Sequence, residues 1–147
     1  MFDLNPEYVK FKNGPVTGVF AGKPIYYRSH SVNKAEILCP DDETCMYCKA
    51  GNAAGRKFKV NFLVMENGML QTKVFSSSYT TSQTLATFNK KHPLAETIVK
   101  ITRNGEGMNT RYIPEAVGAI DEELKKQIAD AYLFDLSEEI AKLKAAV

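Results

Sequence analysis

Residues 57–69 read KFKVNFLVMENGM and predict a β-hairpin. Within residues 57–65 apolar side chains recur at every second position, which is the period of a strand with one buried face: Phe58, Val60, Phe62 and Val64. Asn67-Gly68 signals a type I′ turn, because both residues tolerate a positive φ. Residues 69–76 then form the return strand.

The turn fixes the register of this hairpin. In a two-residue loop Glu66 faces Met69, and counting back places Phe62 opposite Lys73. An apolar side chain therefore faces a charged one, so the alternations of the two strands disagree. A bulge or a strongly coiled strand reconciles such patterns, as barrels often require.

Shorter segments on either side of the hairpin predict further strands. Branched and aromatic residues favour the extended backbone, and clusters of glycine, proline and asparagine separate the segments, including the turn-rich residues 18–24. We expect an irregular strand up to about residue 15 and strands over 24–32, 97–103 and 109–114.

Two segments predict helices. Thr80 with Gln83 resembles a capping box, with Thr80 as the N-cap of a short helix that ends at about Lys91. From residue 118 onward apolar residues approximate the 3.6-residue period of a helix, and Asp135 with Glu138 predicts the cap of a second helical segment.

All three cysteines of the chain fall within ten residues: Cys39, Cys45 and Cys48. Thiolates at C-x2-C spacing wrap one tetrahedral ion, and a short upstream arm supplies a third sulfur. His30, at the end of a predicted strand, is the expected fourth ligand, because His92 lies across the chain beside a proline. The pattern predicts a structural Zn²⁺ site in a compact insert over residues 39–55 that has no helix or strand period.

Other interpretations of this cluster remain open. A redox pair at Cys45 and Cys48 would need a surrounding strand-to-helix unit, and an iron–sulfur centre usually uses four cysteines. A third interpretation is three unrelated free cysteines. Such cysteines usually lie in apolar strands and helices, whereas these three lie around Asp41, Asp42 and Glu43. A zinc ion with four protein ligands has no open position for water, so we expect the protein not to be an enzyme.

The order of the elements favours an OB fold. About five strands with one short helix between the third and fourth match a five-stranded OB barrel, whereas a ferredoxin-like fold needs a second crossover helix. We expect a mainly β protein with a C-terminal helix and two parts: an OB-fold domain over residues 1–117, with the zinc-binding loop insert at about 30–56, and a helical tail over 118–147.

Composition and charge narrow the function classes. Hydrophobic residues make up 44% of the chain, yet no apolar run approaches the ~20 residues that span a membrane. The N-terminus lacks the pattern of a signal peptide, so we expect a cytoplasmic protein with reduced thiols.

Charge is distributed unevenly along the chain. From Gly118 onward seven acids oppose four bases, which leaves 15 bases and 10 acids in residues 1–117. A basic body with an acidic end suits a polyanion binder, although ordinary soluble proteins often carry such surfaces.

Basic and aromatic residues gather on the predicted strands, with Lys57 and Lys59 on the solvent-facing alternation of theirs. Single-stranded nucleic acids are held by such mixtures, because cations follow the phosphates and aromatic rings stack on unpaired bases. Alternating lysines are also the usual solvated face of a strand, and Tyr27 and Tyr112 fit core or surface equally. Together with the barrel layout, the pattern predicts these nucleic-acid contacts: Tyr26, Tyr27, Arg28, Lys49, Arg56, Lys57, Lys59, Lys73, Arg103, Arg111 and Tyr112.

Two groups of motifs carry a family resemblance. A strand ending in His30 precedes Cys39-Pro40, the C-x2-C pair and the basic, then apolar, residues 56–60. Residues 98–112 add an apolar strand, an arginine, a Gly-rich turn and Thr-Arg-Tyr. Over about residues 24–115 the chain resembles the zinc-containing single-stranded-DNA-binding proteins of tailed phages, of the T-even helix-destabilising type.

The resemblance implies an OB fold, a structural zinc in a loop subdomain, and cooperative, sequence-independent binding of single-stranded DNA in replication, recombination and repair. It also implies self-association on DNA, a bacterial host cytoplasm, and contact with replication or recombination proteins through the C-terminal tail. The sequence departs from the family in two respects. The gap from Cys39 to Cys45 is short, and the tail is helical rather than a low-complexity acidic segment.

Two other function classes compete with this one. A zinc-stapled protein–protein adaptor or transcription accessory would use the amphipathic C-terminal helix as its partner surface. A small metal-dependent nuclease would need carboxylates or a histidine free to activate water, and only Asp41, Asp42 and Glu43 cluster near the cysteines.

Overall fold

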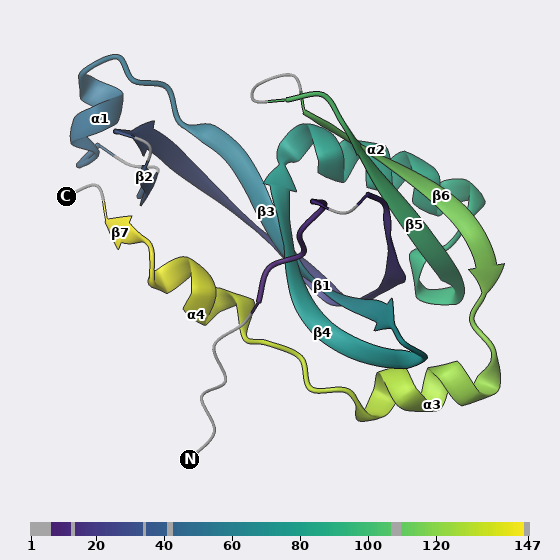
Figure 1. The fold of residues 1–147 in the computed structure, drawn as a ribbon. Helices are drawn as coiled ribbons and strands as arrows, with labels where there is room; N and C mark the ends of the chain where they lie inside the picture. Colours follow the sequence, from purple (N-terminus) through teal and green to yellow (C-terminus); the bar gives the residue numbers. More distant parts are fainter. Residues whose placement is uncertain (1–6, 13, 34, 41–42, 107–109, 146–147) are drawn as a thin grey trace.

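The computed structural model describes residues 7–12, 14–33, 35–40, 43–106 and 110–145 (Figure 1). It confirms a mainly β protein with a few helices. Its elements follow in chain order: β1 Val16–Val32, β2 Ala35–Leu38, α1 Met46–Lys49, β3 Gly55–Glu66, β4 Met69–Ser78, α2 Tyr79–Lys91, the 3₁₀ helix η1 Leu94–Glu96, β5 Thr97–Asn104, β6 Arg111–Ala119, α3 Glu122–Asp130, α4 Leu136–Ala141 and β7 Lys144–Ala145.

One sheet joins the described strands. Its main path runs β4–β3–β1–β5–β6 with antiparallel pairing throughout, and α2 connects β4 to β5. The far end of β1 pairs with β2, on which the two-residue β7 lies parallel. In Figure 1 this end stands away from the strongly curved body of the sheet and carries α1.

The curved sheet is not closed by strand pairing. Within the described ranges no ladder joins β4 to β6, so the pairing does not confirm a five-stranded barrel. The N-terminal segment lies between these two strands. The Val9 amide donates to the Val74 carbonyl of β4 at 2.9 Å, and the Phe11 ring lies 5.1 Å from the Tyr112 ring of β6.

The hairpin of β3 and β4 has the predicted register, with Glu66 opposite Met69 and Phe62 opposite Lys73. No bulge interrupts this ladder as the structure describes it; register shifts occur instead where β1 pairs with β3, between Ala21 and Ile25, and where β5 pairs with β6, between Ile98 and Val99. Every residue of β3 from 58 to 64 is buried, so this strand is covered on both faces. Its apolar side chains therefore need not all lie on one face, and the patterns of β3 and β4 fit together without a bulge.

Two apolar cores lie on opposite faces of the sheet. The larger one fills the concave side beneath α2, and Val9 and Phe11 of the N-terminal segment pack against it: Phe20, Phe58, Val60, Phe62, Val64, Phe75, Leu85, Val99 and Ile101. The smaller one lies on the outer side, where Leu124 and Ile128 of α3 pack against Val19 and Leu63. The helical tail is therefore part of the packed structure.

Several predicted boundaries change. The turn expected over residues 18–24 is the middle of the long strand β1, because pairing with β3 extends across it around a bulge that contains Gly22, whose φ is 74°. The last strand runs five residues past Pro114. Residues 1–6 of the predicted first strand, and Asn109, lie outside the described residues.

The helices also differ in detail from the prediction. Thr80 is not an N-cap, since α2 begins at Tyr79 after Ser78, which makes no side-chain capping bond. The insert expected to lack regular structure contains α1. The predicted cap at Asp135 is confirmed, because its carboxylate accepts from the amides of Ser137 and Glu138 at 3.0 and 3.4 Å.

The tail is also fixed to the sheet by polar contacts. Asn61, buried on β3, donates through Nδ2 to the Phe134 carbonyl at 3.1 Å and accepts from the Phe134 amide at 3.0 Å. Because both backbone groups of one residue are held, the chain between α3 and α4 is fixed against the outer face of the sheet.

Replacing Gly18 tests the close approach of β1 to β3. In Gly18→Ala the added Cβ would collide with the Leu63 backbone carbonyl, which cannot move without disturbing the ladder. We expect the free energy of unfolding to fall by about 2 kcal/mol or more in urea denaturation. Gly55→Ala is the matched control, because its Cβ meets nothing nearer than the Ser29 carbonyl at 3.9 Å. Equal stability of the two variants would contradict this packing.

Candidate metal centre and nucleic-acid surface

The four predicted metal ligands come together at the far end of β1. His30 lies on β1, Cys39 directly follows β2, Cys45 precedes α1 and Cys48 lies within it. The hairpin of β1 and β2 brings Cys39 back toward His30, and the Cys39 amide donates to the Arg28 carbonyl at 2.8 Å. The α1 turn then carries Cys48 to the same side as Cys45.

The donor atoms of these side chains form a compact group. His30 Nε2 lies 3.2 Å from Cys45 Sγ and 3.5 Å from Cys48 Sγ. Cys39 Sγ lies 3.7 Å from Cys45 Sγ and 3.6 Å from Cys48 Sγ, and all four donor atoms fall within 4.8 Å of one another. Ligands of a tetrahedral ion with bonds of about 2.0–2.3 Å are roughly 3.3–3.8 Å apart. The cluster is therefore compatible with a metal site.

Hydrogen bonding within the cluster lowers the pKa of Cys45 and raises the pKa of Cys48. Burial alone would raise the pKa of the Cys45 thiol, but hydrogen bonds from the Cys48 amide and from the side chains of Cys48, Cys39 and His30 lower it to about 7. Hydrogen bonding to the Cys45 and Cys39 sulfurs, together with burial, raises the pKa of Cys48 to about 12. Thiolates are the metal-binding form, and a cation would stabilise all three together.

The surroundings of the cluster are mainly apolar. Buried Ile37 packs against Cys39 and Cys45, with Val32, Tyr47 and Ala54 around them, and the His30 ring lies 5.5 Å from the Tyr47 ring. His30 is fully buried, and its Nδ1 has no hydrogen-bond partner among the described residues. The other histidine, His92, is exposed at the end of α2 against Phe88, which leaves His30 as the histidine of the cluster.

A hollow beside the metal ligands gathers several of the predicted nucleic-acid contacts. Its lining comes from the middle of β1, the start of β3, the end of β2 and the start of α2: Tyr26, Tyr27, Arg28, Leu38, Cys39, Arg56, Lys57 and Tyr79. None of these lining side chains is acidic. The hollow thus joins aromatic rings and cations on one surface.

Tyr26 and the pair formed by Arg56 and Tyr79 occupy the centre of this surface. The Tyr26 side chain is 54% exposed and its ring lies 6.1 Å from that of Tyr79. The Arg56 guanidinium stacks over the Tyr79 ring at 3.8 Å. Tyr79 was not predicted as a contact, because a tyrosine before a helical segment carries no pattern that points to a surface role.

Tyr27 and Lys57, which also line the hollow, share a partner. The Tyr27 hydroxyl donates to Glu36 Oε1 at 3.0 Å, and Lys57 Nζ donates to Glu36 Oε2 at 2.7 Å. Glu36 lies on β2, so these bonds tie the metal-bearing end of the sheet to β3. Burial is the main reason that the pKa of Tyr27 is raised.

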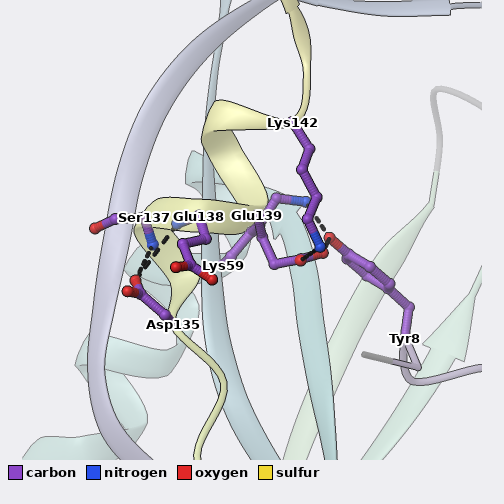
Figure 2. A network of polar contacts seen from close by, with 7 residues as sticks. All are labelled: Tyr8, Lys59, Asp135, Ser137, Glu138, Glu139 and Lys142. Atoms are coloured by element: carbon purple, nitrogen blue, oxygen red, sulfur yellow. Dashed lines mark hydrogen bonds and ion pairs between the residues drawn. The ribbon is translucent and has the colours of Figure 1, made fainter. Parts of the chain in front are cut away.

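The prediction that Lys59 lies on the solvent-facing side of its strand is wrong. Only 4% of the residue is exposed, because the N-terminal segment and α4 cover this side of β3. Lys59 Nζ donates to the Tyr8 hydroxyl at 2.9 Å, which in turn donates to Glu139 Oε1 at 3.2 Å, while Lys142 Nζ donates to Glu139 Oε2 at 2.7 Å (Figure 2). Burial lowers the pKa of Lys59.

The remaining predicted contacts lie elsewhere. Lys49 borders a separate hollow with Glu43, Cys45 and Cys48. Lys73 forms ion pairs with Glu66 at 3.4 Å and Glu7 at 3.8 Å. The exposed Arg103 and Arg111 lie near the ends of β5 and β6, and Tyr112 packs against the concave core.

Comparison with protein-family models, curated proteins and solved structures finds no match to this chain. Within the described residues, no helix is both long and apolar enough to cross a membrane.

Removing His30 tests the metal centre. We expect added metal to raise the melting temperature of the wild-type protein relative to chelator-treated protein, and His30→Ala to abolish most of this increase, because three sulfurs hold the ion poorly. His92→Ala is the matched control and should keep the wild-type increase. The difference between loaded and stripped protein is the relevant measurement, since filling the buried His30 position with alanine also lowers stability without metal. An unchanged increase in His30→Ala would contradict the assignment.

Proposed function

We propose that the protein binds single-stranded DNA without sequence preference, as a phage-type protein that protects single strands in replication, recombination and repair. The observation that carries this proposal is the hollow in which Tyr26, Arg28, Arg56 and Tyr79 meet beside the metal cluster. Cations there would neutralise phosphates, and the exposed Tyr26 ring would stack on a base. Stacking tolerates any sequence because every base has a π-face.

We further propose that the sheet is an OB-type barrel. The path β4–β3–β1–β5–β6 with α2 between β4 and β5 is compatible with the partly open, five-stranded Greek-key barrel of that fold. The N-terminal segment, through Val9 and Phe11, spans the interval between β4 and β6 that a closed barrel would seal by pairing.

We propose that the cluster binds a structural zinc ion. Three thiolates and one imidazole are a donor set of structural zinc sites, and four protein ligands leave no position for a water molecule. His30, Cys39, Cys45 and Cys48 would hold the ion, which would supply cohesion to an end of the sheet with only a small apolar core. This arrangement supports a binding protein rather than an enzyme.

The competing functions have less support. An adaptor that used the apolar face of α3 would have to compete with the sheet, because Leu124 and Ile128 already pack there. A nuclease would use the acids near the cluster, of which Glu43 is exposed beside Cys45 and Cys48, while Asp41 and Asp42 lie outside the described residues. Self-association on DNA and contacts of the tail with replication or recombination proteins remain part of the proposal.

Titration of a fluorescent dT12 oligonucleotide at two salt concentrations tests DNA binding. Affinity should fall as salt rises, and Arg56→Ala should weaken binding and reduce the slope of log K against log salt by about 0.7, as expected for one lost phosphate contact on a single strand. Lys126→Ala, which removes an exposed cation of α3 outside the hollow, is the matched control. Absence of wild-type binding at low salt would refute the proposal.

Metal analysis tests the identity and role of the ion. We expect about one zinc per chain in metal-replete protein, by analogy with saturated four-ligand sites. Cys48→Ser should lower both the zinc content and the melting temperature, whereas Met46→Ser, at an exposed position of the same helix, should change neither. Less than about half an equivalent of zinc in the wild type would count against a structural zinc site.

A further inference from the structure

A second hollow lies on the other side of Tyr26 from the metal cluster. It has a volume of about 400 Å³ and opens between the middle of β1 and α2. Its walls include Phe20, Pro24, Leu85, Ala86 and Asn89, and none of its lining residues is charged. It is therefore a mainly apolar space next to a basic and aromatic one.

The two hollows form one continuous surface. Tyr26 lines both of them, and a third hollow between them is lined by Tyr26, Arg56, Tyr79, Ser82, Gln83 and Ala86. The lining of all three together contains Arg28, Arg56 and Lys57 but no acidic side chain. The surface thus runs from the metal cluster across Tyr26 to α2, cationic at one end and apolar at the other.

Two polar groups of the second hollow, the Ser82 hydroxyl and the Asn89 side-chain oxygen, already form hydrogen bonds within the protein. The Ser82 hydroxyl donates to the Tyr79 carbonyl at 2.7 Å, and Asn89 Oδ1 accepts from the Leu94 amide at 2.8 Å. A ligand in this space would gain apolar contact and stacking against Tyr26 more than hydrogen bonds. Such a pocket would accept a flat ring system with little regard to its polar edge.

We infer that the second hollow is a nucleobase pocket, in which an unpaired base of the bound strand inserts beyond Tyr26 while the neighbouring phosphates lie over Arg28 and Arg56. This inference rests on the proposed function and adds the site that receives the base. The occupant is specified by the surface itself. A flat, uncharged ring attached to an anionic backbone matches an apolar pocket that continues into a groove lined by Arg28, Arg56 and Lys57, of which Lys57 is paired with Glu36.

Filling the pocket from α2 tests this assignment. Ala86 is an exposed residue of α2 that lines the second and third hollows, so Ala86→Phe places a ring in the space, and Ala86→Leu fills it in part. The matched control is Thr87→Phe, which adds the same ring at the next exposed position of the helix. Each protein is titrated at low salt with fluorescent dT12 and with an abasic deoxyribose-phosphate 12-mer, and its melting temperature is measured.

The two oligonucleotides separate contacts to the base from contacts to the phosphate. A base stack is worth about 1–3 kcal/mol, so Ala86→Phe should weaken dT12 binding about fivefold or more, with Ala86→Leu intermediate. The affinity of Ala86→Phe for the abasic strand should stay within about twofold of wild type. Thr87→Phe should leave the affinities for both strands unchanged. Wild-type affinity of Ala86→Phe for dT12, or equal losses for both strands, would overturn the base pocket while leaving DNA binding intact. Failure of the wild-type protein to bind either strand would refute the proposed function itself.

Discussion

The structure depends on the backbone pairing of β1 with β3, which runs from Gly18 opposite Val64 to Ser29 opposite Gly55. β1 is also paired at its start with β5 and at its end with β2, so one strand connects the curved body to the metal cluster. Because a strand rises about 3.3 Å per residue, Tyr26 and His30 are roughly 13 Å apart along β1. The metal site and the aromatic hollow are neighbours for that reason, and the bulge between Ala21 and Ile25 sets how β1 continues beyond the body of the sheet.

The end of β1 that carries the proposed metal ligands is stabilised by only a small apolar core. Its core comprises Ile37, Cys39 and Cys45, against nine buried residues in the concave core. A bound ion would compensate, because metal-binding free energy adds directly to folding free energy where the ligands come from separate segments. The hydrogen bonds that Glu36 accepts from Tyr27 and Lys57 add a second connection between this end and β3, and both donors line the hollow. Any loosening of this end would therefore disturb the proposed DNA surface as well.

The C-terminal segment decides which face of the sheet remains accessible. α3 covers Leu63, the Phe134 backbone is held by Asn61, and Glu139 of α4 meets Tyr8 above Lys59. Lys59, Asn61 and Leu63 alternate along the outer face of β3, so that face is covered from residue 59 to residue 63. Lys59 keeps polar partners within 3.5 Å, as a buried ammonium requires, but it is withdrawn from solvent. The hollows around Tyr26 remain accessible, and they combine cations with aromatic rings.

The sequence by itself determined what depends on local spacing. The C-x2-C pair with its upstream cysteine predicted the metal cluster, Asn67-Gly68 predicted the hairpin and its register, and period 2 with period 3.6 predicted a mainly β chain with a helical tail. Only the tertiary structure decided what depends on contacts between distant segments. Lys59 has the same local pattern as Lys57, yet Tyr8 and Glu139, from opposite ends of the chain, bury it. Tyr79 joins the surface only because α2 starts beside Arg56. Strand β1 continues through its turn-rich segment because β3 pairs with it on both sides of the bulge.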